Sequence, residues 1–237
     1  MVRSRWLLAA LLCAGLPPAR AWTPVLEISA ASSNERSTPR IVRSPANDLL
    51  TAYINKGSPW RVYARQRSAG GTWGPVEAVS GTSAGSTRPD AAFDGQGRPH
   101  ILYASYLTGG ALDLVHAYRS SEAWTVNVLT ATSQYEDEPH VVTDSGGRIH
   151  MVFTRGDKES SAADVVYRRW NGSAWEGETV IGHTDHAYYR RPEICIDPAN
   201  LLHVTWGDKV GSNYVVRYTR SDGSTWPGAV WSICAAP

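Results

Sequence analysis

The chain has 237 residues, 42% of them hydrophobic, so it is long enough for one large domain and apolar enough to bury a core. Its 10 Trp and 11 Tyr stand beside only 2 Phe, and 21 Gly and 14 Pro supply turns, a composition that favours short β-strands and excludes disorder. With 23 basic and 22 acidic residues, the chain lacks the excess of positive charge that binding to nucleic acid requires.

The first 21 residues have the pattern of a secretory signal peptide. Arg3 and Arg5 precede an apolar run over residues 6–16, and small residues on either side of Arg20 provide a cleavage site after Ala21. The run is too short for a membrane span, which needs about 20 apolar residues. We therefore expect a secreted or periplasmic protein, cut between Ala21 and Trp22, without a membrane span.

Four internal repeats follow the leader. Each repeat opens at a proline: Pro39, Pro89, Pro139 and Pro192. Each holds a late tryptophan, and these recur every 51 residues: Trp73, Trp124, Trp175 and Trp226. The repeats cover about 37–82, 87–132, 137–184 and 190–235. Fixed spacing of this kind is typical of repeat architectures.

Each repeat predicts four short strands. An apolar strand at the proline is followed by a turn and a second strand, as in residues 94–103, 144–153 and 197–206. A third strand that ends on a tyrosine and a fourth that starts at the tryptophan complete the repeat. Four strands in about 50 residues form one propeller blade, whose apolar face only a neighbouring blade can cover. Residues 22–237 therefore predict a single all-β domain, a β-propeller of four-stranded antiparallel blades.

The two ends of the chain leave the closure of the ring open. Residues 22–29 resemble the predicted fourth strand at 73–80, so they form an extra N-terminal outer strand. The sequence then predicts five outer strands, but only four repeats to supply the other three strands of a blade. The chain is either a compact four-bladed ring with a spare strand or an incomplete propeller, whose open blade edges would pair with another chain or in a homo-oligomer.

The hairpin sequences carry a resemblance to a known superfamily. Residues 221–226 read Ser-Asp-Gly-Ser-Thr-Trp, and weaker copies stand at 67–73, 119–124 and 171–175. They resemble the Asp-box (BNR-like) repeats of the sialidase superfamily, although they are one residue short and the three weaker copies lack the aspartate. The resemblance implies a propeller fold, with six blades in the sialidases against four repeats here. Because such boxes lie on outer hairpins, they say little about chemistry.

The same resemblance implies where an enzymatic site would lie. Sialidases use three arginines, an aspartate acid/base and a tyrosine nucleophile over the propeller axis. In this chain those roles would fall to Arg40, Arg88, Arg190, Asp137 and Tyr189. Residues 188–192 are similar to the aromatic-Arg-Ile-Pro signature of the family, but they open the fourth repeat, whereas the family signature opens the first.

Independently of any family, the residues just before the opening prolines should face one mouth of the central channel. They are Thr38, Arg88, Glu138 and Arg191. With their neighbours they make a polar funnel suited to a charged or sugar ligand, or a set of salt bridges between blades. The candidate ligand-binding residues are Arg88, Glu138, Tyr188, Tyr189, Arg190 and Arg191.

Three histidines recur in register: His100, His150 and His203. Their recurrence favours a structural role, a hydrogen bond to the neighbouring blade, over zinc binding, so we expect no metal and no cofactor. Two strands separate Cys195 from Cys234. At about 4.8 Å per strand this spacing is too long for a disulfide.

The remaining signals concern binding more than catalysis. The non-repeating aromatics include Trp60, Tyr106 and Tyr214, and sugars stack on such rings. No serine elbow, phosphate loop or zinc-protease motif is present in the sequence. The sequence therefore predicts a secreted, non-catalytic module that recognises glycan or extracellular protein through the propeller face. The alternative is a sialidase-like exo-glycosidase acting at the central channel.

Overall fold

The computed structural model describes residues 27–29, 34, 36–82, 84–107, 110–157, 162–185, 190–228 and 230–233. Within these ranges every regular element is a β-strand, and no helix is long and apolar enough to cross a membrane. The strands form four four-stranded antiparallel sheets, each a simple meander in which neighbours along the chain are neighbours in the sheet. The predicted all-β fold with four blade repeats is confirmed. The predicted signal peptide lies outside the described residues.

The first sheet contains β1 (Arg36–Arg43), β2 (Leu49–Asn55), β3 (Arg61–Arg67) and β4 (Trp73–Ala78). The second contains β5 (Ser86–Phe93), β6 (Pro99–Tyr106), β7 (Leu112–Tyr118) and β8 (Thr125–Val128). The third contains β9 (Tyr135–Thr143), β10 (Ile149–Gly156), β11 (Ala163–Trp170) and β12 (Thr179–Thr184). The fourth contains β13 (Glu193–Ile196), β14 (Leu202–Val210), β15 (Asn213–Ser221) and β16 (Trp231–Ser232).

Two of the predicted strand boundaries are wrong. The third strand ends on its tyrosine only in the second sheet, at Tyr118, and the fourth strand starts at its tryptophan only in the first sheet, at Trp73. In the later sheets the tryptophan precedes the strand and packs against the buried cluster shared with the preceding sheet. Its side chain thus covers a neighbouring sheet, a contact that strand propensity does not encode.

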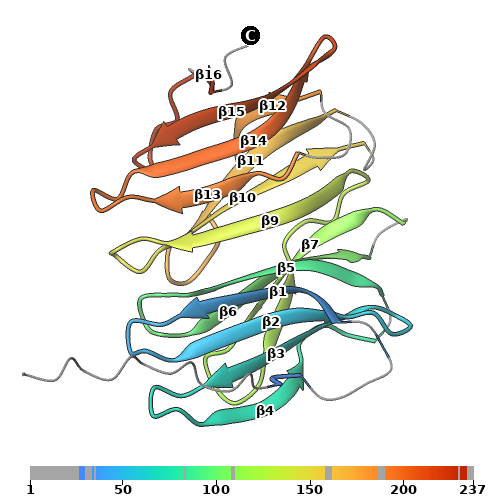
Figure 1. Cartoon of the computed structure of the whole chain (residues 1–237), viewed down its shortest axis with the longest axis vertical. Helices are drawn as coiled ribbons and strands as arrows, with labels where there is room; N and C mark the ends of the chain where they lie inside the picture. The colour runs from blue at the N-terminus through green and yellow to red at the C-terminus, as the bar shows by residue number, and fades with distance from the viewer. Residues whose placement is uncertain are drawn as a thin grey trace, which may run out of the picture.

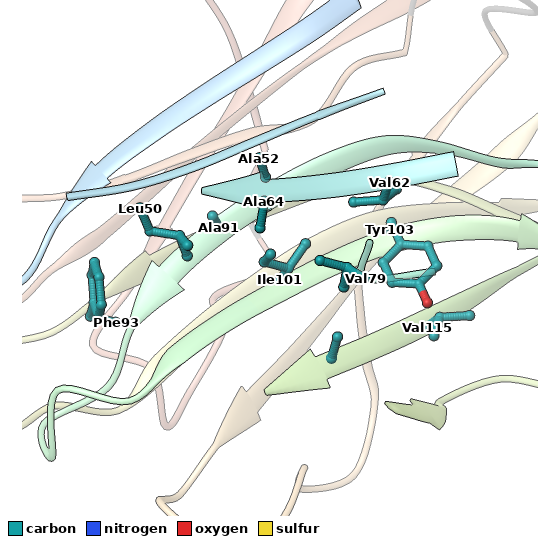
Figure 2. Packing of buried hydrophobic residues seen from close by; sticks show 11 residues of the cluster. Leu50, Ala52, Val62, Ala64, Val79, Ala91, Phe93, Ile101, Tyr103 and Val115 are labelled. Atoms are coloured by element: carbon teal, nitrogen blue, oxygen red, sulfur yellow. The ribbon is translucent and has the colours of Figure 1, made fainter. Parts of the chain in front are cut away.

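The core consists of apolar layers between successive sheets. Residues alternate between the two faces of each strand, so each inner sheet packs on both neighbours. Figure 2 shows the first layer, in which Leu50 and Ala52 of β2 pack with Ala91 of β5 and Ile101 of β6. A second layer joins the second and third sheets around Leu102 and Phe153, and a third joins the third and fourth sheets. These layers stack the four sheets as propeller blades.

The sheets form an open arc, and not a closed four-bladed ring. Among the described residues, the three buried clusters join first to second, second to third and third to fourth sheets, and none joins the fourth to the first. Figure 1 shows the first and fourth sheets at opposite ends of the longest axis of the molecule. Of the two alternatives left open by the sequence, the structure therefore has the incomplete propeller.

Only the end of the predicted extra N-terminal strand is described. Glu27, Ile28 and Ser29 are not in a strand, and the Ile28 carbonyl accepts a hydrogen bond from Arg65 Nη1 at 3.1 Å. Ile28 and Ser29 line a small cavity of about 130 Å³ together with Thr51, on the face of the first sheet that points away from the second sheet. The assignment of residues 22–29 as an outer strand stays a prediction.

Candidate functional site: the polar mouth of the channel

The residue before each opening proline has a left-handed backbone. The φ angles are 47° at Thr38, 49° at Arg88, 55° at Glu138 and 29° at Arg191. In β1, β5 and β9 the register with the second strand shifts at this point, which marks a β-bulge. A non-glycine residue in this region costs about 1 kcal/mol or more, and such outliers are common where a side chain must be aimed at a site. The same local strain thus recurs at the same place in all four blades.

Residues in or next to all four inner strands form the wall of one cavity of about 270 Å³. We call this cavity the polar mouth. It is lined by Thr38, Arg40, Arg88, Pro89, Glu138, Pro139, His140, Arg191 and Glu193. All four residues before the prolines are among them, and their role in binding a ligand stays a prediction. The side chains of Arg40 and Arg88 are about a third or more exposed, so a solute can reach them.

The residues just after the prolines form a second ring, which the sequence reading missed apart from Arg40. His140 is its centre: His140 Nδ1 lies 3.1 Å from Glu193 Oε2 and 3.6 Å from Asp90 Oδ2. On its other side, His140 Nε2 lies 3.4 Å from Arg40 Nη2. Asp90 does not line the polar mouth, but it also contacts Arg40, with 3.7 Å between Nε and Oδ1. Their position in the sequence could have indicated them, because Arg40, Asp90, His140 and Glu193 each directly follow an opening proline.

The contact with Arg40 determines the tautomer of His140, and burial determines its charge. Arginine has no acceptor, so Nε2 accepts from Arg40 and the proton of a neutral ring lies on Nδ1, facing Glu193 and Asp90. Burial, with Arg40 and Arg191 close by, lowers the pKa of His140 to about 4. Burial raises the pKa of Asp90 to about 6 and also raises the pKa of Glu193. Two carboxyl groups with raised pKa values thus flank one neutral imidazole.

The remaining predicted site residues divide into two groups. Arg88 forms an ion pair with Asp137, and Glu138 Oε2 accepts a hydrogen bond from the Arg191 backbone nitrogen at 2.9 Å, so these residues link the second, third and fourth sheets at the polar mouth. Arg190 is buried and does not line the polar mouth. Of the three arginines predicted to converge, Arg40 and Arg88 line the polar mouth and Arg190 does not.

The two predicted tyrosines, Tyr188 and Tyr189, lie outside the described residues. Their assignment to the site stays a prediction.

A second hollow adjoins the polar mouth. This aromatic groove has a volume of about 680 Å³ and lies between the β2–β3 loop and the start of β5. Trp60 and Tyr106 line it with their rings about half exposed, and Lys56 lies 5.2 Å from the Trp60 ring centre. Arg88 lines both hollows, so the aromatic groove and the polar mouth meet at this side chain.

The other end of the channel opens into a hollow of about 460 Å³ lined by Val42–Pro45, by Ala91–Phe93 of β5, by Val141–Asp144 and by Ile196. Its lining mixes apolar side chains with Arg43 and Asp144, and Asp144 is already bonded to Arg148 and His150. The polar mouth has the denser set of charged groups, three arginines and two glutamates, and it adjoins the aromatic groove, which makes it the candidate site.

The recurring histidines are structural, but the partner predicted for them is wrong. His150 Nδ1 lies 2.7 Å from the Tyr167 hydroxyl and its Nε2 lies 3.2 Å from Asp144 Oδ2, both within the third sheet. His100 and His203 pair in the same way with Asp94 and Asp197, the first acids of their own turns. Each histidine thus ties a turn to the third strand of its own blade, because the strand ladder brings those groups closer than any neighbouring sheet.

The described residues contain no group of three or more His, Cys, Asp or Glu side chains that could hold a metal ion. Cys195, in β13, is an exposed free thiol. Cys234 lies outside the described part of the chain, so the absence of a disulfide between them stays a prediction.

Comparison with known proteins identifies the fold. No family model matches the sequence, and no curated protein does either. Solved structures do: a Hadza microbial sialidase matches with a TM-score of 0.60 and 15% identity, over 81% of this chain and 45% of the sialidase. A Penicillium chrysogenum alpha-L-arabinanase complexed with arabinobiose matches with a TM-score of 0.58 and 15% identity, over 82% of this chain and 65% of the arabinanase. The chain has a sialidase-like β-propeller fold.

A further match is a protein of unknown function from Dyadobacter fermentans, with a TM-score of 0.62 and 13% identity, over 84% of this chain and 69% of that protein. This sialidase-like propeller spans about half the length of the sialidase and about two thirds of the arabinanase. At these identities the matches establish the architecture, and the chemistry must be argued from the site.

Proposed function

We propose that this sialidase-like propeller is a secreted, non-catalytic module that binds glycans at the polar mouth and along the aromatic groove. One observation carries the proposal: Arg88 lines both hollows, so charged groups and exposed aromatic rings form one continuous surface. Sugars need this combination, since their C–H faces stack on aromatic rings while their hydroxyls bond to polar side chains.

The arrangement of charges also supports a saccharide. Arg40, Arg88 and Arg191 share the polar mouth with Glu138 and Glu193, so donors and acceptors of both signs face one space. Planar guanidinium groups can donate two parallel hydrogen bonds to a carboxylate or to adjacent hydroxyls. Propellers with this fold include the microbial sialidase and the alpha-L-arabinanase complexed with arabinobiose, so the fold can hold a saccharide.

The test is a glycan array, followed by calorimetric titration of the glycan that binds most tightly. We expect Trp60→Ala in the aromatic groove and Arg88→Gln at the junction each to weaken binding by about 10-fold or more. Tyr214→Ala, which removes an exposed ring from the fourth sheet, is the matched control and should leave the affinity unchanged. Equal affinities for all four proteins would refute the assignment of the site.

A protein ligand remains the other partner predicted for the same face. A surface of this mixed polarity would bind protein through Trp60, Tyr106 and Arg88, the residue types enriched in hot spots. A protein partner would leave the glycan array blank and still depend on Trp60. The homo-oligomer through open blade edges also stays a proposal, and the two end sheets of the arc are where it would form.

The second candidate function is an exo-glycosidase, which one observation favours. Burial raises the pKa of Glu193, which lines the polar mouth, and raises the pKa of Asp90 beside it to about 6. A carboxyl group that keeps its proton near neutral pH can act as a general acid toward a leaving sugar. The sialidase-like set of Arg40, Arg88, Arg190, Asp137 and Tyr189 is the alternative proposal for such a site, in which buried Arg190 would act from behind the wall of the polar mouth.

Turnover of a fluorogenic sialoside and a fluorogenic arabinofuranoside distinguishes the two functions. Hydrolysis that is lost in Glu193→Gln and retained in Tyr214→Ala would show that the protein is a glycosidase, and the proposal of a non-catalytic module would be wrong. Absence of hydrolysis with retained glycan binding supports the module.

A further inference from the structure

The joint between the third and fourth sheets contains a specific lock. The hairpin Ser221–Trp226 leaves the fourth sheet and lies on the third sheet, where the Gly223 carbonyl accepts hydrogen bonds from the Tyr167 hydroxyl at 3.4 Å and from Arg169 Nη1 at 3.2 Å. The Trp226 ring packs edge to face on Tyr167, with 4.9 Å between ring centres. We call this contact the lock. Its hairpin half is Ser221–Trp226 of the fourth sheet, and its acceptor half is Tyr167 and Arg169 of the third sheet.

The other joints repeat this arrangement. Trp175 of the third sheet donates from Nε1 to His116 Nδ1 of the second sheet at 3.1 Å, and His116 occupies the position of Tyr167. Trp124 of the second sheet packs against the cluster that the first and second sheets share. In every joint of the arc, therefore, the later sheet places its tryptophan on the earlier one.

The fourth sheet carries an acceptor half with no described sheet on it. His203 Nδ1 lies 2.8 Å from the Tyr218 hydroxyl and Arg220 stands opposite His203, as Arg169 stands opposite His150 in the third sheet. The side chain of His203 is 26% exposed, whereas that of His150 under the hairpin is 2% exposed. Trp231 beside Tyr218 is also exposed, so this face presents an aromatic surface to solvent.

The first sheet carries the complementary hairpin half. Residues 68–73 read Ser-Ala-Gly-Gly-Thr-Trp, which matches the length and the Ser-x-Gly-x-Thr-Trp pattern of residues 221–226. Trp73 is half-buried, with the Arg65 guanidinium 5.5 Å from its ring centre, and no described sheet lies before it. Of the four hairpins, these two share the pattern. Residues 221–226 already dock on the third sheet, on an acceptor half that matches His203 and Tyr218 of the fourth sheet.

We propose that the Ser68–Trp73 hairpin of one copy docks on the His203–Tyr218 face of a second copy, which joins the two arcs head to tail. The occupant is a second copy because this chain carries both matched halves at its two open ends, and docking would continue the joint already repeated three times inside the arc. The contact is heterologous, so it closes if two arcs complete a ring and otherwise grows into longer assemblies.

Light scattering of the mature chain over about a hundredfold range of concentration tests this docking. We expect a mass that rises to twice that of the monomer or more. Trp73→Ala and Tyr218→Ala should each weaken the association by about 10-fold or more, and Trp60→Ala, an exposed tryptophan outside the lock, should not. Circular dichroism of each variant checks that it is folded. A wild-type protein that stays monomeric throughout would overturn the proposal.

Mixing the two variants, once circular dichroism has shown both to be folded, tests the head-to-tail geometry. Trp73→Ala keeps the acceptor and Tyr218→Ala keeps the hairpin, so an equimolar mixture retains one intact joint per pair. We expect the mixture to form a dimer at a concentration where each variant alone is monomeric. A mixture that stays monomeric when the wild-type protein associates would show a different interface and overturn the inference.

Discussion

Asp90 and His140 are adjacent ionisable groups, and burial shifts the pKa of each toward its neutral form. Each is largely removed from water, and each would lose solvation if charged, so burial favours the neutral carboxyl and the neutral imidazole. Arg40 supplies the compensating charge, at 3.7 Å from Asp90 Oδ1. We expect a charged ligand in the polar mouth to shift the pKa of His140, which lines it, so that binding depends on pH below neutral.

The first prediction concerns Asp90→Asn. Because the pKa of Asp90 rises from 3.8 to about 6 on folding, the native state holds a proton that the unfolded state has lost between these pH values. The contribution of Asp90 to the free energy of unfolding is therefore present at pH 4 and is lost as pH rises through 6, by about 2–3 kcal/mol. Denaturant unfolding should show Asp90→Asn gaining stability relative to wild type by this amount between pH 4 and pH 7.

His140 provides the matched comparison of opposite sign. Its pKa falls from 6.5 to about 4, so its contribution to stability is present at neutral pH and is lost as pH falls through this window. His140→Gln should therefore gain stability relative to wild type as pH falls. A stability difference between Asp90→Asn and wild type that does not vary with pH would contradict the assigned protonation state.

At the scale of the element, the turns between first and second strands determine how closely two blades approach. Gly95 in the second sheet donates from its backbone nitrogen to the Gly147 carbonyl at 3.0 Å. A Cβ on Gly147 would lie 2.2 Å from Gly95 Cα, and its φ is +79°. The third sheet therefore needs glycine here both for conformation and for contact with the neighbouring turn.

The second prediction compares two glycines with nearly the same backbone. Gly97 has φ of +74° but open space around it, so Gly97→Ala carries only the conformational cost of about 1 kcal/mol. Gly147→Ala carries that cost and a clash with backbone, which should destabilise the protein by about 2 kcal/mol more. Thermal or denaturant unfolding measures both. Equal losses for the two variants would show that the turns do not touch.

The elements also show how far local sequence can predict this molecule. The proline and tryptophan spacing predicts four blades, because a repeated side chain marks a repeated packing position. It misplaces the fourth strands, since Trp124, Trp175 and Trp226 are recruited to a neighbouring sheet. The contacts of His140 with Arg40, Asp90 and Glu193 cannot be predicted from local sequence, because they depend on how the four inner strands converge and on the backbone bulges in these strands.

At the scale of the whole molecule, the arc has two inner sheets covered on both faces and two end sheets. Whether a ring closes depends on contact between the first and last blades, and no local pattern encodes a contact over that sequence distance. This is why the repeats predict the number of blades and leave their closure open. The aromatic face of the fourth sheet, with exposed Trp231 and half-buried Tyr218, is the visible consequence of the open end.

The third prediction follows from this unequal coverage. β11 and β15 are equivalent third strands, but every residue of β11 is buried or half-buried, while β15 begins with two exposed residues and continues with four half-buried ones. Amide hydrogen exchange of the dilute monomer, read by mass spectrometry, should therefore be faster in β15 than in β11 by about 10-fold or more. Equal protection would contradict an open arc in the monomer.

The most direct test of the glycan site is a crystal structure of the protein with the tightest ligand from the array. The account predicts sugar rings in the polar mouth beside Arg88, Glu138 and Arg191, with at least one ring stacked on Trp60 or Tyr106 in the aromatic groove. Ordered sugar bound elsewhere, on the outer strands or at the other end of the channel, with the polar mouth and the aromatic groove both empty, would contradict it.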